Sequence, residues 1–157
     1  MDADAADSRH RPLVGWRLLS LLYDFFPMLG IWFLVVVAAL VLNRGAAVLP
    51  GTPASALEFI ALLGATGVYA TASWRRGGQT IGMKPWRLYV TDIDGQHAPW
   101  GRLWLRYGVG VISLLCAGAG FWWAWIDRAG LTWHDRASGT RMIRDFARDA
   151  LQEARRR

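Results

Sequence analysis

The charged residues of the first long apolar segment are the first candidates for chemistry. Arg17 lies at the start of this segment, and Asp24 follows seven residues later, before an apolar run from Phe25 to Leu42. Seven residues make about two helical turns, so both side chains project from nearly the same helix face, about 10 Å apart along the axis. An ionised carboxylate inside a membrane-spanning helix costs several kcal/mol unless another group compensates it. We therefore expect Asp24 to have a partner or to change its protonation.

Pro27 follows Asp24 by three residues and adds a second kind of chemistry. A proline inside a helix cannot donate the hydrogen bond that would satisfy the carbonyl of Tyr23, four residues before it. A free carbonyl beside a carboxylate can coordinate a monovalent cation. In the alternative interpretation, Asp24 pairs with an arginine from another helix and holds the helices together. We favour this ion pair over cation binding.

The composition is typical of a small membrane protein, whose helices must position these residues. The chain has 157 residues, of which 54% are hydrophobic and ten are tryptophan. Its 18 Lys and Arg exceed its 12 Asp and Glu, giving a formal charge of +6. Basic residues beside apolar spans bind anionic lipid and set topology, so we expect a lipid bilayer as partner and no nucleic acid. Cys116 is the only cysteine, which excludes an intrachain disulfide, and we expect a buried, unreactive thiol.

Two apolar segments predict membrane-spanning helices. The first covers Trp16 to Leu42, and the second covers Leu57 to Trp74 and is followed by Arg75 and Arg76. Basic residues are retained on the cytoplasmic side, so the N-terminus and the end of the second helix should be cytoplasmic. The connection between the spans, rich in glycine and proline, should face the exterior. Residues 1–12 are small and polar and predict a disordered cytoplasmic tail.

The third apolar segment, Leu105 to Ile126, leaves two interpretations open. A straight helix of this length measures about 33 Å, which is only just enough to cross a bilayer. Gly118 and Gly120 interrupt the segment. Three tryptophans typical of a membrane interface follow: Trp122, Trp123 and Trp125. We favour a re-entrant helix-break-helix, which keeps the arginine-rich end of the chain in the cytoplasm, and a full third span is the alternative.

Smaller elements complete the predicted fold. Trp86 to Asp92 alternates in the manner of a strand, and Asp94 and Gly95 form a turn signal. Met142 to Arg157 places apolar residues on one helical stripe, which predicts a helix on the inner membrane surface. We therefore expect an all-α membrane protein with a small cytoplasmic strand-and-turn element. Its expected parts are a tail (1–12), a membrane domain (13–143) and a basic amphipathic C-terminal helix (144–157).

Two motifs, together with Arg17 and Asp24, resemble the RDD family of small bacterial membrane proteins, which is named for one arginine and two aspartates. The segment Gly77-Gly78-Gln79-Thr80-Ile81-Gly82 is similar to the G-Q-T-x-G motif after the family's second span. The segment His134-Asp135-Arg136-Ala137-Ser138-Gly139-Thr140 is similar to its closing H-D-x-x-x-G-T motif. The resemblance covers roughly Val14 to Ile143.

The resemblance implies roles for individual residues. Arg17 and Asp24 stand where the family has its arginine and its first aspartate. Asp135 is the implied second aspartate, and Asp127 is the competing candidate. The further contributors are Tyr23, Gly77, Gly78, Gln79, Thr80, Gly82 and His134. For the family the resemblance implies a transport role in the bacterial plasma (inner) membrane, with sodium–proton antiport suggested for some members.

Two functions follow from this sequence. In the first, Asp24 and Asp135, tuned by Arg17, form one protonatable site that couples proton and monovalent cation movement in a homo-oligomer. In the second, these residues form a structural charge network in an accessory or scaffold protein, whose cytoplasmic loop and tail bind a membrane protein partner.

We do not expect an enzyme, a cofactor or a metal site. His134 and Asp135 are adjacent in the sequence, but no nucleophile or zinc-ligand set accompanies them. Gly77, Gly78 and Gly82 predict a turn at the membrane surface, because the context of a phosphate-binding loop is missing.

Overall fold

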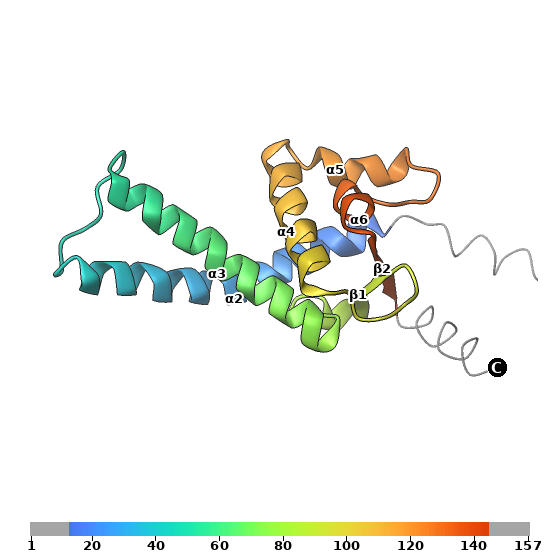
Figure 1. The fold of residues 1–157 in the computed structure, drawn as a ribbon, viewed down its shortest axis with the longest axis horizontal. Helices are drawn as coiled ribbons and strands as arrows, with labels where there is room; N and C mark the ends of the chain where they lie inside the picture. The colour runs from blue at the N-terminus through green and yellow to red at the C-terminus, as the bar shows by residue number, and fades with distance from the viewer. Residues whose placement is uncertain (1–12, 145–157) are drawn as a thin grey trace, which may run out of the picture.

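The computed structural model describes residues 13–144, so the predictions for the N-terminal tail and for residues 145–157 lie outside the described residues. Two long helices form a hairpin that projects from one end of the molecule. The remaining elements gather at the opposite end, beside the start of the first helix and the end of the second (Figure 1). The fold is therefore mostly helical, with a small two-stranded sheet.

The hairpin consists of α2 (Val14–Leu42, 29 residues) and α3 (Pro53–Gly77, 25 residues). Among residues 13–144, these are the two helices long and apolar enough to cross a membrane singly, which confirms both predicted spans. Helix α3 begins before Leu57 because the Thr52 side chain caps it, accepting a hydrogen bond from the Ser55 N–H at 3.2 Å.

The third apolar segment folds as two helices rather than one. It comprises α4 (Trp100–Leu115), α5 (Ala119–Trp122) and the 3₁₀ turn η3 (Trp123–Trp125), and its two halves meet at 107°. The bend occurs at Ala117 and Gly118, whose φ angles are +53° and +75°. Gly120 instead lies inside α5, where an added Cβ would come 2.4 Å from Ser113 Oγ, so its role is close packing. Cys116 caps α4 and is exposed, so the expected burial of its thiol is wrong.

The sheet pairs two segments that are far apart in the sequence. Strand β1 (Leu88–Asp92) follows the 3₁₀ turn η2 (Lys84–Trp86) and runs antiparallel to β2 (Thr140–Arg144). The observed strand β1 is therefore two residues shorter than the strand predicted from Trp86 to Asp92. The prediction of a helix from Met142 is wrong, because Met142 lies opposite Val90 in the sheet. The short helix α6 (Trp133–Ser138) ends at Gly139, whose φ of +59° turns the chain into β2.

A small apolar core holds this end of the molecule together. Met83, Leu88, Val90, Ala98 and Leu103 are buried in it. Helix α4 also packs closely on α3 at Gly67, where an added Cβ would lie 2.5 Å from the Trp104 ring. The sheet, α4 and α6 are thereby fixed against the cytoplasmic ends expected for α2 and α3, where the charged residues lie.

Candidate functional site

Asp135 lies at the centre of a buried charge network. Helix α6 begins with a capping box, in which Thr132 Oγ1 accepts from the Asp135 N–H at 3.3 Å. Asp135 Oδ2 in turn accepts from the Thr132 N–H at 3.2 Å. These reciprocal hydrogen bonds fix the orientation of the carboxylate. The side chain of Asp135 is fully buried, so its charge requires compensation.

Two arginines supply that compensation. Arg17 Nη1 lies 2.6 Å from Asp135 Oδ2 and also donates to Thr132 Oγ1 at 3.1 Å. Arg106 Nη1 contacts Asp135 Oδ1 and donates to Thr140 Oγ1 at 2.8 Å. Both arginines are buried. This network, which we call the Asp135 network, connects α2 and α4 to α6 and β2.

The electrostatics of the network keep Asp135 ionised. Burial alone would raise the pKa of its carboxyl group, but the positive charges of Arg106 and Arg17 outweigh burial and hold the pKa well below its usual range. Burial and the neighbouring Arg106 lower the pKa of His134 to about 3, so its imidazole is neutral at pH 7. The His134 ring packs against Phe121, with ring centroids 4.9 Å apart.

Asp24 occupies a separate site with only neutral partners among the described residues. Its Oδ1 atom accepts from the Tyr69 hydroxyl at 2.8 Å and from the Gly82 N–H at 2.9 Å. Its Oδ2 atom accepts from the Thr80 hydroxyl at 2.5 Å. The side chain is buried in a helix of membrane-spanning length. The expectation that Asp24 pairs with an arginine is therefore wrong for residues 13–144.

The glycine-rich motif brings two of these donors, the Thr80 hydroxyl and the Gly82 N–H, onto α2. Gly82 packs so closely on α2 that an added Cβ would lie 2.3 Å from the Ser20 carbonyl oxygen. No larger residue fits there without moving the loop, which explains glycine at this position. Gly78 caps α3 in the left-handed conformation, with φ of +71°, and starts the loop. Thr80 and Gly82 are thus the motif residues that reach Asp24.

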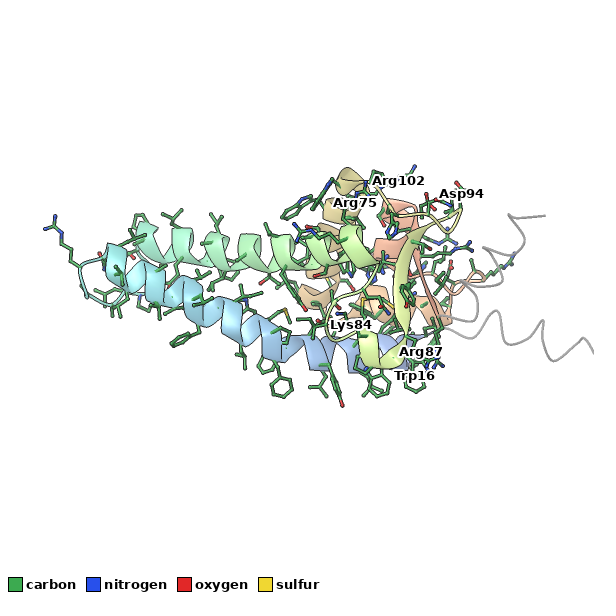
Figure 2. All side chains as sticks on the ribbon, turned by 90° about the horizontal axis from the view of Figure 1, so that it is seen from below. Trp16, Arg75, Lys84, Arg87, Asp94 and Arg102 are labelled. Atoms are coloured by element: carbon green, nitrogen blue, oxygen red, sulfur yellow. The ribbon has the colours of Figure 1, made fainter. Side chains whose placement is uncertain are left out.

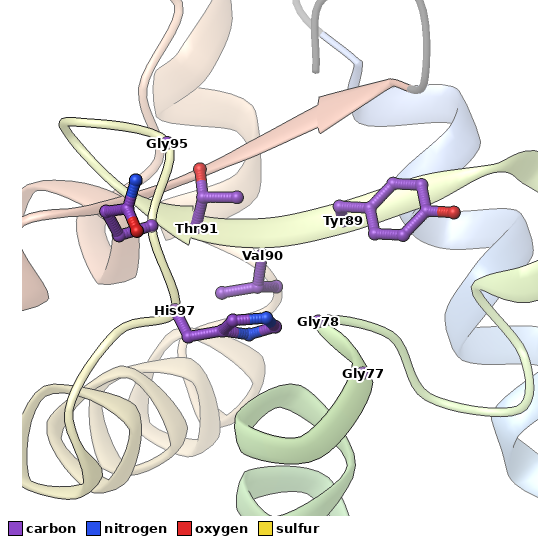
Figure 3. A pocket seen from close by; sticks show the side chains of 8 residues that line it. Gly77, Gly78, Tyr89, Val90, Thr91, Gly95 and His97 are labelled. Atoms are coloured by element: carbon purple, nitrogen blue, oxygen red, sulfur yellow. The ribbon is translucent and has the colours of Figure 1, made fainter. Parts of the chain in front are cut away.

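The other motif residues do not contact Asp24 directly, although the Ile81 N–H donates to the Tyr69 hydroxyl at 3.1 Å. Gln79 is half-buried, and within residues 13–144 its side chain forms no hydrogen bond. Gly77 and Gly78 line a shallow pocket of about 20 Å³, with Val90 and His97 across from them (Figure 3). That volume holds about one water molecule. Among the described residues, no group of three or more His, Cys, Asp or Glu could hold a metal ion.

Asp127 and Tyr23 have local roles. Asp127 accepts hydrogen bonds from the Leu131 and Ala129 N–H groups and pairs with exposed Arg136, so it shapes the loop before α6. Asp135, rather than Asp127, is the aspartate that meets Arg17. The Tyr23 ring packs edge-on against Trp86, with centroids 5.6 Å apart.

The structure thus separates residues that the sequence suggested would share one site. Arg17 and Asp135 come together, whereas Asp24 binds Tyr69 and the glycine-rich loop. The sequence interpretation missed Arg106 and Tyr69. The signal for Arg106 was present, because a charge in an apolar helix needs a partner, which is the argument that identified Asp24.

Comparison with known proteins identifies the family. No curated protein matches the chain, and no solved structure matches it. The model of the RDD family matches residues 11–139, a span that contains the Asp135 network's aspartate and arginines together with Asp24 and the glycine-rich motif. With most of its length matched, and with two helices of membrane-spanning length, the chain belongs to the RDD family.

Proposed function

We propose that this protein transports protons or monovalent cations across the bacterial plasma membrane by binding them at Asp24. The observation that carries the proposal is the set of partners of this carboxylate. Tyr69, Thr80 and the Gly82 N–H are all neutral donors. Asp24 can therefore gain a proton or a cation without breaking an ion pair among the described residues.

The chemistry of the two hydroxyl groups suits such an exchange. A hydroxyl group can donate or accept a hydrogen bond, so Tyr69 and Thr80 can reorient when Asp24 becomes protonated. Carboxylate and hydroxyl oxygens are also suitable ligands for a hard monovalent cation. Asp135 cannot serve in the same way, because Arg17 and Arg106 hold it ionised. We therefore assign transport to Asp24 and a structural role to Asp135.

The proposed topology places one end of the molecule in the cytoplasm. The start of α2, the end of α3 and both strands lie at the same end (Figure 1). Basic side chains are exposed there, including Arg75, Arg76 and Arg102, as expected for a cytoplasmic face. Contact of Arg17 and Arg106 with Asp135 keeps α4 and α6 beside the start of α2, so we propose that α4 and α5 form a re-entrant segment.

The proposal requires more than one copy of the chain. Two spanning helices and a bent segment cannot enclose a pathway, so the path would lie between protomers of a homo-oligomer. In this proposal the protein has no catalytic activity and needs no cofactor.

Proton flux in reconstituted vesicles tests the proposal. Wild-type protein should move protons when a sodium or potassium gradient is imposed, as measured with a trapped pH-sensitive dye. Asp24→Asn keeps the size of the side chain but cannot ionise, so its flux should equal that of protein-free vesicles. Asp127→Asn is the matched control, because it removes a carboxylate whose ion-pair partner, Arg136, is exposed. Undiminished flux in folded Asp24→Asn protein would refute transport at this site.

The Asp135 network favours a second function, that of an accessory or scaffold protein. Its buried ion pairs join the start of the membrane helix α2 to α6, next to β2. Such a rigid connection suits a protein that presents a cytoplasmic surface to a membrane protein partner. In that case Asp24→Asn should lower protein abundance without changing any flux, and a specific partner should co-purify at fixed stoichiometry in mild detergent.

A further inference from the structure

Aromatic and basic side chains gather at one edge of the cytoplasmic end. We call this group the Trp86 patch, and it consists of Trp16, Tyr23, Lys84, Trp86 and Arg144. The Trp86 ring lies between two aromatic residues of α2, with centroids 5.0 Å from Trp16 and 5.6 Å from Tyr23. The Arg144 guanidinium lies over the Trp16 ring, 4.9 Å from its centroid. Three separate elements, α2, η2 and β2, therefore build one surface.

The patch combines an exposed positive charge with buried donors. Among the described residues, Trp86 Nε1 and Arg144 Nε are buried and have no hydrogen-bond partner. Lys84, two residues before Trp86 in η2, is exposed. The closest acidic residue along α2, Asp24, is buried and its oxygens already accept hydrogen bonds. The patch is thus cationic, and none of its charge is neutralised by a carboxylate of α2.

Its position matches the headgroup level of a bilayer. Trp16 and Tyr23 are seven residues apart, so they share a face of α2 near the end where the helix leaves the membrane. Both rings are partly exposed, at 37% and 47%, and this face continues into the apolar surface of α2. Tryptophan and tyrosine side chains favour this boundary because they combine an apolar ring with a polar group.

We propose that the Trp86 patch binds the headgroup phosphate of an anionic phospholipid of the cytoplasmic leaflet. Lys84 and Arg144 supply the positive charge. The rings of Trp16 and Tyr23 pack beside the glycerol backbone and the first part of the acyl chains. Basic sites at the cytoplasmic end of membrane helices commonly recognise such headgroups. This site is independent of the transport proposed at Asp24.

The test uses the detergent-solubilised full chain with phosphatidylglycerol and phosphatidylcholine as probes, and retained lipid is counted by native mass spectrometry. Wild-type protein should retain phosphatidylglycerol in preference to phosphatidylcholine. The double variant Lys84→Gln with Arg144→Gln should weaken this retention by at least about tenfold. The matched control is Arg75→Gln with Arg102→Gln, which removes the same charge from the opposite edge of the molecule (Figure 2). The control variant should retain the lipid as the wild type does.

Several outcomes would overturn the proposal. Equal loss of lipid in the control would indicate attraction by net charge alone. Equal retention of both lipids by wild-type protein would remove the role of the anionic headgroup. Displacement of phosphatidylglycerol by millimolar inorganic phosphate would identify a site for free anions instead. Lys84→Gln alone, at an exposed position, should still lower retention if the double variant fails to fold.

Discussion

Asp24 and Asp135 carry the same functional group, yet their partners give them different properties. Asp135 lies between two arginines, whereas Asp24 accepts hydrogen bonds from two hydroxyls and a backbone N–H. A carboxylate between two positive charges remains ionised, and a carboxylate with neutral partners can exchange protons or cations. The chemistry of this protein is therefore decided by which side chains reach each aspartate.

Substitution of Asp135 should strongly destabilise the fold. Asp135→Asn leaves Arg17 and Arg106 buried without a counter-ion, and breaking a buried pair in this way costs about 3–5 kcal/mol. We expect a large decrease in melting temperature, measured by tryptophan fluorescence in detergent. Asp127→Asn should change the melting temperature far less, because its partner Arg136 is 57% exposed. Equal melting temperatures for the two variants would show that the Asp135 network contributes no special stability.

His134 should make stability depend on pH. The folded protein holds the pKa of His134 at about 3. In the unfolded chain the pKa is about 6.5, so below that pH the unfolded state binds a proton that the folded state does not. The free energy of unfolding should therefore fall, by up to about 1.4 kcal/mol per pH unit, as the pH decreases from 6.5 toward 3.

The measurement for His134 is the melting temperature between pH 7.5 and pH 5. Asp135 should contribute little in this window, because its lowered pKa means that its contribution is lost only under more acidic conditions. His134→Phe keeps an aromatic ring beside Phe121 and should flatten the dependence. A slope equal to that of the wild type in this variant would assign the pH dependence to other groups.

Several site residues could be predicted from the sequence, and others could not. Arg17, Asp24 and Asp135 were identified because a charge in an apolar helix is costly and because the motifs resemble a family. Their pairing was not predictable, since Arg17 lies 118 residues from Asp135 in the sequence. Tyr69 gave no signal, because a tyrosine in an apolar helix is usually a packing residue.

At the level of elements, the glycine-rich loop is the part that completes the Asp24 site. Gly82→Ala would place a Cβ 2.3 Å from the Ser20 carbonyl oxygen and should push the loop off α2. We expect a loss of about 1–3 kcal/mol of stability together with loss of ion-linked flux. Gly108→Ala is the control within α4, where an added Cβ meets nothing within 4 Å. A Gly82→Ala protein with unchanged melting temperature and flux would show that the loop is dispensable.

The elements differ in how well the sequence predicted them. The spans α2 and α3 were clear, because long apolar runs have few other interpretations. Strand β2 was missed because Ile143 also fits an apolar helical stripe that continues along the segment from Met142. The choice of strand is decided by pairing with β1, some 50 residues earlier in the sequence. The spacing of apolar residues within one segment does not indicate a pairing strand so far away in the sequence.

At the level of the whole molecule, the proposed topology places the α2–α3 connection outside the cell and the other connections of the described residues in the cytoplasm. In a Cys116→Ser background, Ala47→Cys should react from outside intact cells with a membrane-impermeant maleimide. Gln96→Cys and Arg128→Cys flank the third apolar segment and should react only after the membrane is opened. Labelling of Arg128→Cys from outside would mean that α4 and α5 cross the membrane, which would contradict the re-entrant segment.

In the proposed function, Asp24 exchanges a proton for a monovalent cation. The most direct test of this exchange is proton release from purified protein in weakly buffered detergent solution, recorded with a pH-sensitive dye when sodium or potassium chloride is added. The starting pH is varied from 7.5 down to 4.5, because only protein that has bound a proton at Asp24 can release it. The wild type should release protons in part of this range on addition of one of these salts but not of choline chloride, and Asp24→Asn should release none. Equal release from Asp24→Asn, or no release from folded wild-type protein with either cation, would contradict the claim.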